Sequence, residues 1–255
     1  MEVKFRTLDF VTPSGVNFTI REQNGEDEDI LSNPLDSRNL MNLTKFIAAI
    51  VVKTDCTPSG KLSVEDALNL PLLDRYCILL KSRIFSLGDE IEIQYTWPGT
   101  KEAVSYEDLV SNFVFEDYSN IPTEEEMNEK PFACPFYPNR DNLKDMRIEL
   151  KSGKVIMFDC MTGKGEQYLL SLPEDKKTRN SELLARNLRL EVEGNPEKVT
   201  NFSCFSVRDM AEIRKAVAAY DPSFQGLTEL EDPKTGDKIM FPIMASPSFF
   251  YLTEA

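Results

Sequence analysis

Acidic side chains are the residues of this chain whose types could carry out chemistry. Asp27, Glu28 and Asp29 form one group, and Asp66 and Asp74 are further candidates for acid–base catalysis by paired carboxylates. Each lies where a helix is expected to begin, and a carboxylate at that position caps the helix and interacts favourably with its dipole. The acidic cluster of Glu26, Asp27 and Glu28 also lacks the alternating oxygen ligands of a Ca²⁺ loop. We therefore favour a structural role for these acids and keep a carboxylate-based enzyme as an alternative.

The other residue types that support catalysis are scarce. The 255 residues include no histidine, which removes the commonest general base, the usual partner of a nucleophilic Ser or Cys, and a common metal ligand. Gly163-Lys164-Gly165 lacks the spacing of a phosphate-binding loop. Five widely spaced cysteines without a Cys-x-x-Cys pair are typical of reduced thiols: Cys56, Cys77, Cys134, Cys160 and Cys204. We predict no catalytic, cofactor-binding or metal-binding residue.

The charge balance restricts the class of partner. The chain has 43 acidic and 29 basic residues, a net charge of −14, and no run of Lys and Arg that could cover a phosphate backbone. No apolar stretch approaches the roughly eighteen residues of a membrane span, and the first residues do not form a signal peptide. We expect a soluble protein made in the cytoplasm, with neither nucleic acid nor membrane as partner.

A repeated spacing indicates how the elements are organised. Ser14-Gly15, Gly25 and Glu28 recur 138 positions later as Ser152-Gly153, Gly163 and Glu166. Each Ser-Gly pair lies between two alternating apolar segments, which predicts a β-hairpin, and each later Gly precedes a helical pattern. The capping box Ser63–Asp66 has a counterpart in Ser206–Asp209. The spacing therefore predicts an internal duplication.

The predicted fold class is α+β, with two related small domains that each contain a β-hairpin, helices and a second β-hairpin. The first domain covers residues 1–115 and the second covers residues 144–255. Residues 116–143 contain four prolines and an acidic run, which predicts a linker.

Within these domains the patterns predict particular elements. Residues 90–97 alternate as a clear strand, and Ser105 to Asp108 predicts a helix start with Leu109, Val110 and Phe113 on its apolar side. The helix after Pro71 is expected to end at Gly88, and to hold the charged ends of Asp74, Arg75, Lys81 and Arg83 in water. Two further helices are expected to include Val51 in the first copy and Leu188 and Leu190 in the second.

The end of the chain carries an aromatic tail. Phe249, Phe250, Tyr251 and Leu252 follow one another next to two prolines. Such a cluster needs cover, and it packs either on its own core or on another subunit. We predict partner contacts for these four residues and, at the tip of the first hairpin, for Pro13 and Ser14.

The residues of the first domain also resemble a known family. Phe10 to Leu31 combines an apolar strand, a Pro-Ser-Gly turn, a strand ending in Ile-Arg-Glu, and Gly-Glu-Asp-Glu before a helix. This order is similar to the start of tailed-bacteriophage tail and baseplate assembly proteins. The segment from Leu73-Asp74-Arg75 to Arg83-Ile84-x-Ser86-x-Gly88 resembles the T4-type baseplate hub family. The resemblance covers roughly residues 3–97, with a weaker echo over 146–243.

The resemblance implies a non-enzymatic structural component of a bacteriophage tail or baseplate, in its hub or wedge region. Its partners would be other tail and baseplate proteins in a homo- or hetero-oligomer, and its location would be the virion after synthesis in the host cytoplasm. A transient assembly chaperone that is absent from the mature virion is the alternative. Some relatives carry Cys-x-x-Cys pairs near the hairpin that corresponds to Tyr95–Gly99, but this hairpin lacks cysteine, so a zinc ribbon is not carried over.

Overall fold

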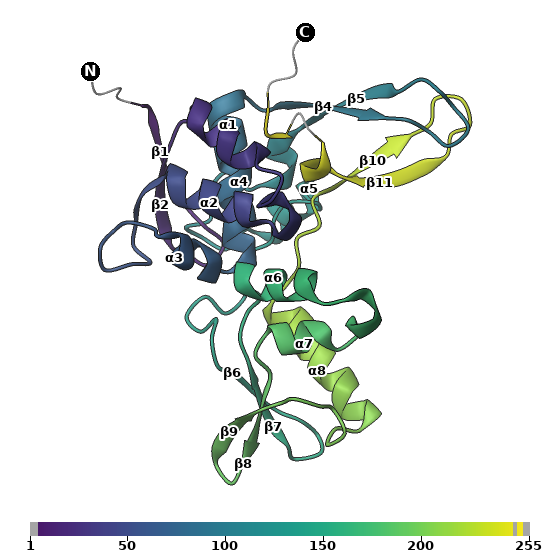
Figure 1. Ribbon diagram of the computed structural model, residues 1–255. Coiled ribbons are helices and arrows are strands. Elements are labelled where there is room, and N and C mark those ends of the chain that lie inside the picture. The colour runs from purple at the N-terminus through teal and green to yellow at the C-terminus, as the bar shows by residue number, and fades with distance from the viewer. Residues whose placement is uncertain (1–4, 247–248, 252–255) are drawn as a thin grey trace.

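The computed structural model describes residues 5–246 and 249–251. It has two lobes, seen one above the other in Figure 1, and is built from helices and small antiparallel sheets. The predicted α+β class is confirmed.

The first lobe begins with a hairpin and a helix. Gly15 occupies the turn with φ +85°, a backbone conformation that glycine adopts without strain. Asn24 and Asp27 form a capping box at the first helix, and the Asp27 carboxylate also binds the Arg21 guanidinium at 2.7 and 2.8 Å. The antiparallel sheet has the order β1-β2-β3, with β1 at Thr7–Val11, β2 at Asn17–Arg21 and β3 at Val51–Thr54.

Four helices pack on this sheet and on one another: α1 (Gly25–Ser32), α2 (Met41–Ile50), α3 (Val64–Asn69) and α4 (Leu72–Leu87), with a short 3₁₀ turn η1 (Ser37–Asn39) before α2. The expected helix through Val51 ends one residue earlier, because Val51 pairs with Ile20 of β2. β-branched residues pack well on a sheet, so tertiary pairing decides this boundary.

Helix α4 is the central element of the lobe. It carries charged residues whose charged ends were expected to lie in water. Asp74, Arg75 and Arg83 are instead buried, with 1%, 3% and 4% of their surface exposed. Arg83 donates to the carbonyl oxygens of Gly88 and Glu90, so neutral oxygens replace its solvent. The predicted helix end at Gly88 is confirmed, with φ +92°.

A pair of stacked hairpins projects from the first lobe (Figure 1, upper right). One hairpin has strands β4 (Glu90–Tyr95) and β5 (Val104–Leu109), and the other has β10 (Leu227–Glu231) and β11 (Lys238–Pro242). We call these four strands the double hairpin. They contact each other through Tyr106 Oη, which donates to Glu231 O at 2.9 Å, and through Thr228 Oγ1, which donates to Asp108 at 2.6 Å.

Strand β5 corrects the helix expected from Ser105. All six residues of β5 pair with β4, and only a 3₁₀ turn, η2 (Val110–Phe113), follows. Val104 and Tyr106 pack on the core, while Ser105 and Glu107 face solvent. This alternation has the period of a strand, and pairing with the well-formed β4 overrides the local capping signal.

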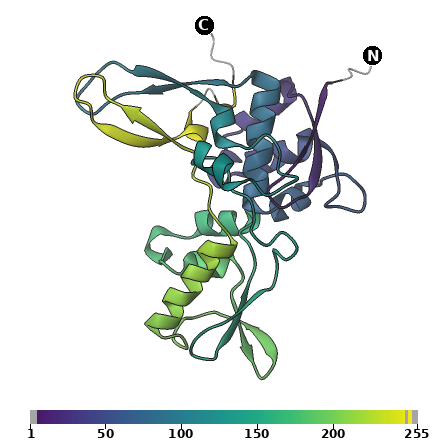
Figure 2. The same cartoon turned by 180° about the vertical axis from the view of Figure 1, so that it is seen from behind.

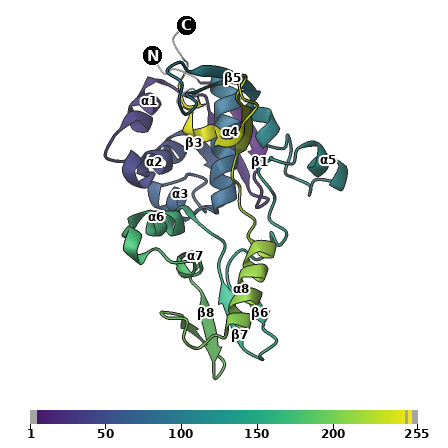
Figure 3. The same ribbon diagram turned by 90° about the vertical axis from the view of Figure 1, so that its right-hand side faces the viewer.

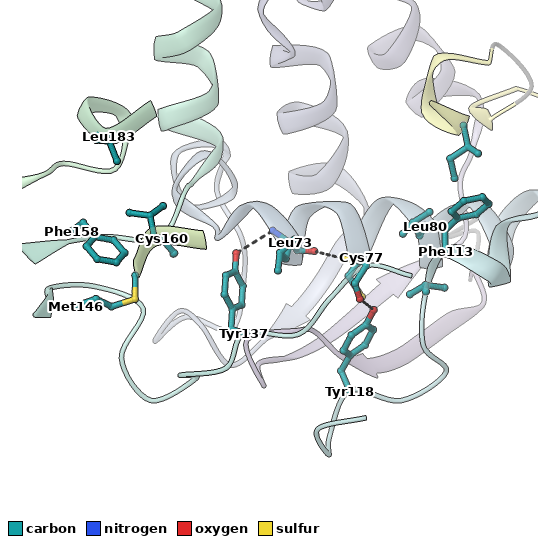
Figure 4. Close-up of a cluster of buried hydrophobic side chains, with 14 of the residues drawn as sticks. Leu73, Cys77, Leu80, Phe113, Tyr118, Tyr137, Met146, Phe158, Cys160 and Leu183 are labelled. Atoms are coloured by element: carbon teal, nitrogen blue, oxygen red, sulfur yellow. Dashed lines mark hydrogen bonds between the residues drawn. The ribbon is translucent and has the colours of Figure 1, made fainter. Parts of the chain in front are cut away.

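Residues 116–143 are anchored in the core, although they were expected to form a linker. They contain the helix α5 (Glu124–Glu129), which stands off the side of the first lobe in Figure 3. On either side of it Tyr118, Cys134 and Tyr137 are fully buried. Tyr118 Oη donates to Cys134 O, and Tyr137 Oη accepts from the Leu73 backbone N–H at 3.2 Å (Figure 4). The composition of the segment did not reveal these tyrosine anchors.

The second lobe contains a four-stranded antiparallel sheet in the order β6-β7-β8-β9. Figure 2 shows the long helix α8 beside this sheet. The expected helix through Leu188 and Leu190 stops early, because Asn187 has φ +53° and Leu190 then pairs with Ile156. The strands are β6 (Met146–Glu149), β7 (Val155–Phe158), β8 (Arg189–Val192) and β9 (Asn195–Lys198). The helices are α6 (Gly163–Ser171), η3 (Glu174–Lys176), α7 (Ser181–Ala185) and α8 (Val207–Tyr220).

Both lobes share an order of elements. A hairpin is followed by helices, and a third strand then pairs with the second strand of the hairpin, as β3 does with β2 and β8 with β7. Helices α3 and α8 both begin with the expected capping boxes, at Ser63 and at Ser206. The duplication itself stays a prediction.

The expected second domain, residues 144–255, is divided in space. After α8 the chain returns to the first lobe, where it forms β10, β11 and the 3₁₀ turn η4 (Ile243–Ala245). One buried cluster runs from Phe158 and Leu183 of the second lobe to Leu80 and Phe113 of the first (Figure 4). The two lobes are therefore joined by a continuous core.

Candidate interaction surface

The turn of the first hairpin buries the two residues for which partner contacts were predicted. Pro13 and Ser14 are both buried, which corrects the expectation that they meet a partner. The Ser14 backbone N–H donates to Asp74 Oδ1 at 2.9 Å, and Ser14 Oγ donates to Asp74 Oδ2 at 2.5 Å. Burial raises the pKa of the Asp74 carboxyl to about 6, although these hydrogen bonds oppose the shift. The turn is thus an internal contact between hairpin and α4.

The aromatic tail packs on the chain itself. Phe249 is 1% exposed and belongs to the core, and its ring meets the Phe250 ring edge-on with centroids 4.9 Å apart. Phe250 and Tyr251 are partly buried. Of the two alternatives for the tail, packing on its own core is what the structure shows for these three residues. Leu252 lies outside the described residues.

The outward side of the β4–β5 hairpin forms an acidic face. The register places Glu92 directly opposite Glu107, and two like charges at opposed positions of a sheet repel one another. Ser105 Oγ donates to Glu92 Oε1 at 2.6 Å, which holds this carboxylate on the face. The face consists of Glu90, Glu92, Gln94, Ser105, Glu107 and Leu109. None of these described residues is basic.

A hollow opens at the base of the acidic face. Its volume is about 730 Å³, and it lies between the end of α4, the two strands and Tyr251. Leu87, Leu109 and Tyr251 give it an apolar part, whereas Glu90, Glu92 and Glu107 give it an acidic part. Among the described tail residues, Tyr251 lines this candidate surface, which we call the basal hollow.

The charge of the whole chain is concentrated near this surface. Residues 89–109 and 227–242 together carry ten acidic and three basic residues, so they account for half of the net charge of −14. Carboxylates grouped on a projecting element create a negative potential that attracts a basic partner and repels a second copy of the same surface.

The candidate carboxylates for an enzyme have separate structural contacts. Asp27 pairs with Arg21, Asp66 forms the capping box of α3 with Ser63, and Asp74 is buried against Ser14. Glu28 and Asp29 are exposed on α1. Across the described ranges no group of three or more Cys, Asp and Glu side chains is arranged to hold a metal ion.

Part of this surface could be recognised in the sequence. The alternation in residues 90–97 assigns Glu90, Glu92 and Gln94 to one side of a strand. The opposition of Glu92 and Glu107 could not be recognised, because residues 105–108 carry a competing helix signal. The contribution of Tyr251 to the hollow depends on the return of the chain after α8.

The fold defines a class: a two-lobed α+β protein with a projecting, acidic double hairpin. In the described part of the chain no helix is long and apolar enough to cross a bilayer. Comparisons with protein-family models, with curated proteins and with solved structures found no match.

Proposed function

We propose that this protein is a non-enzymatic structural component of a bacteriophage tail or baseplate and acts through protein–protein contacts. Its partners are other tail or baseplate proteins, and its final location is the virion. The resemblance of residues 3–97 to tail and baseplate proteins suggests that the particle is a tailed bacteriophage.

The observation that carries the proposal is the acidic face with its basal hollow. A directly opposed pair of glutamates lowers the stability of the isolated chain, and such a local conflict is typical of a functional surface. A basic partner would relieve the repulsion between Glu92 and Glu107, and the apolar wall of Leu87, Leu109 and Tyr251 would receive an apolar side chain.

The experiment is mass spectrometry of purified mature particles together with affinity purification of the protein from producing cells. We expect the protein to be present in the particles at a fixed ratio to other tail proteins, and to co-purify with them before assembly is complete. Absence from the mature particles would contradict the proposal.

A transient assembly chaperone is the second candidate, because the same acidic surface could hold a basic partner until it is incorporated. It predicts co-purification with tail proteins from cells but absence from mature particles. The two samples of the same experiment therefore distinguish the two functions.

A further inference from the structure

A second cavity lies where the two lobes and the C-terminal segment meet. Its volume is about 340 Å³, within the range of small-ligand sites. Helices α2, α4 and α6 and the segment after β11 all contribute to it, and its apolar wall includes Leu43, Leu72, Leu79, Met244 and Phe250.

One polar atom of the cavity lining is an acceptor without a donor. Asn42 is 7% exposed, and its Oδ1 is buried without a hydrogen-bond partner in the described structure. Asn42 Nδ2 donates to Leu31 O at 2.8 Å, and this contact fixes which end of the amide carries the oxygen. A buried acceptor without a partner costs stability, so a donor placed there would be favourable.

The second acceptor in the lining is the Glu166 carboxylate, which forms no ion pair within 4.0 Å in the described structure. Tyr76 Oη donates to Glu166 Oε1 at 3.2 Å, and burial raises the pKa of Glu166. Arg75 also lines the cavity and its positive charge opposes this shift, although the two side chains form no ion pair within 4.0 Å. Its Nη1 donates to Ala67 O at 2.7 Å and its Nη2 to Thr44 Oγ1 at 3.0 Å.

The wall of the cavity is also strained. Leu40 lines it in the left-handed region, with φ +58°, which is uncommon for a residue other than glycine. Strain of this kind persists where the surrounding structure enforces it, and it is common at ligand sites.

We propose that this cavity binds a primary aliphatic amine. The ammonium group donates to the Glu166 carboxylate and to Asn42 Oδ1, while the aliphatic stem packs on the leucines of the wall. An alcohol would offer these two acceptors only a neutral donor, and an ionised carboxylic acid would offer them no donor. The amine is either a free alkylamine or the lysine side chain of another protein. The inference does not depend on the proposed function.

The test is calorimetric titration of the full-length chain with n-pentylamine and with Nα-acetyl-lysine methylamide. The matched comparators are 1-pentanol and pentanoate. Because a charge-assisted hydrogen bond is replaced by a weaker one, we expect the amine to bind at least about tenfold more tightly than the alcohol. Equal affinity for amine and alcohol would overturn the proposal.

The arms of the titration distinguish the source of the amine. Binding of the lysine derivative at least as tightly as n-pentylamine would assign a lysine side chain of another protein. Binding of n-pentylamine alone would assign a free alkylamine. Both outcomes support the amine site, and binding of neither compound would refute it.

Three variants locate the binding. Glu166→Gln should reduce the affinity for the amine to that for the alcohol. Ala245→Phe at the exposed rim should block the cavity without altering Glu166, and so it remains informative if Glu166→Gln does not fold. Glu65→Gln is the control, because Glu65 is exposed on the neighbouring α3 and contacts Lys164 at 3.7 Å. Unchanged amine binding in Glu166→Gln or in Ala245→Phe would contradict the assignment.

Discussion

Asp74 gives the fold a dependence on pH. Its carboxyl is buried against Ser14, and burial raises its pKa from 3.8 to about 6. An acid with a raised pKa keeps its proton longer in the folded state, so the folded chain binds more protons than the unfolded chain between these two pH values. Stability attributable to Asp74 is therefore highest below pH 4 and falls as the pH rises through 6.

The matched variant is Asp74→Asn, which has nearly the same shape and does not titrate. Between pH 4 and pH 7 the wild type should lose up to about 3 kcal/mol of unfolding free energy relative to this variant. Urea unfolding of both proteins at several pH values measures the difference. A difference that stays constant over this range would show that Asp74 does not titrate as described.

Gly163 is needed for a close contact between the lobes. A Cβ at this position would lie 2.7 Å from Cζ of the buried Arg75, whose guanidinium is held by Ala67 O and Thr44 Oγ1. Because Arg75 must move and weaken these bonds, Gly163→Ala should lower the unfolding free energy by about 1–3 kcal/mol. Denaturant titration measures this loss.

The control is Gly25→Ala, at the corresponding place in the predicted repeat. A Cβ on Gly25 would meet nothing within 4 Å, and Gly25 begins helix α1. This variant should be neutral or slightly stabilising, because alanine favours a helix more than glycine does. An equal loss of unfolding free energy in both variants would show that the contact with Arg75 is not the cause of the loss.

At the scale of elements, charge repulsion lowers the stability of the β4–β5 hairpin, and a single substitution should remove this repulsion. Glu107→Gln abolishes the repulsion with Glu92 and should raise the unfolding free energy by about 0.2–1 kcal/mol. The gain should shrink as salt is added, because salt screens exposed charges. Urea unfolding at low and high salt measures both effects.

Glu197→Gln is the control for this substitution. Glu197 is exposed on β9 and faces Leu190 across the sheet, so no opposed acid is relieved by its replacement. A gain of the same size in Glu197→Gln would mean that the net charge of the chain, and not the pair on the hairpin, sets the stability.

The elements that could be predicted from the sequence are those with local signals. The capping boxes at Ser63 and Ser206 and the helix end at Gly88 depend on residues close in sequence, and the structure confirms them. Strands β3 and β8 exist because a strand distant in the sequence pairs with them, and β5 exists because it pairs with the preceding strand β4. Helical patterns near Val51 and Ser105 could not reveal that pairing.

At the scale of the whole molecule, the order of the elements along the chain differs from their arrangement in space. Residues 227–246 and 249–251 return to the first lobe, and there they complete both the double hairpin and the basal hollow. Backbone bonds from Leu72 N to Met161 O at 2.8 Å and from Gly163 N to Leu70 O at 3.3 Å join the lobes. A boundary placed by composition at residues 116–143 misses these contacts between distant residues.

The central claim is that the acidic face holds a basic protein partner. Its direct measurement is the dissociation constant between this protein and the tail protein that co-purifies with it, for the wild type and for Glu92→Gln/Glu107→Gln. The control is Glu193→Gln/Glu197→Gln, which removes the same charge on the β8–β9 hairpin. We predict that the hairpin variant binds at least about tenfold more weakly, with a reduced dependence on salt, while the control binds as the wild type does. Equal affinity of the hairpin variant and the wild type would contradict the account.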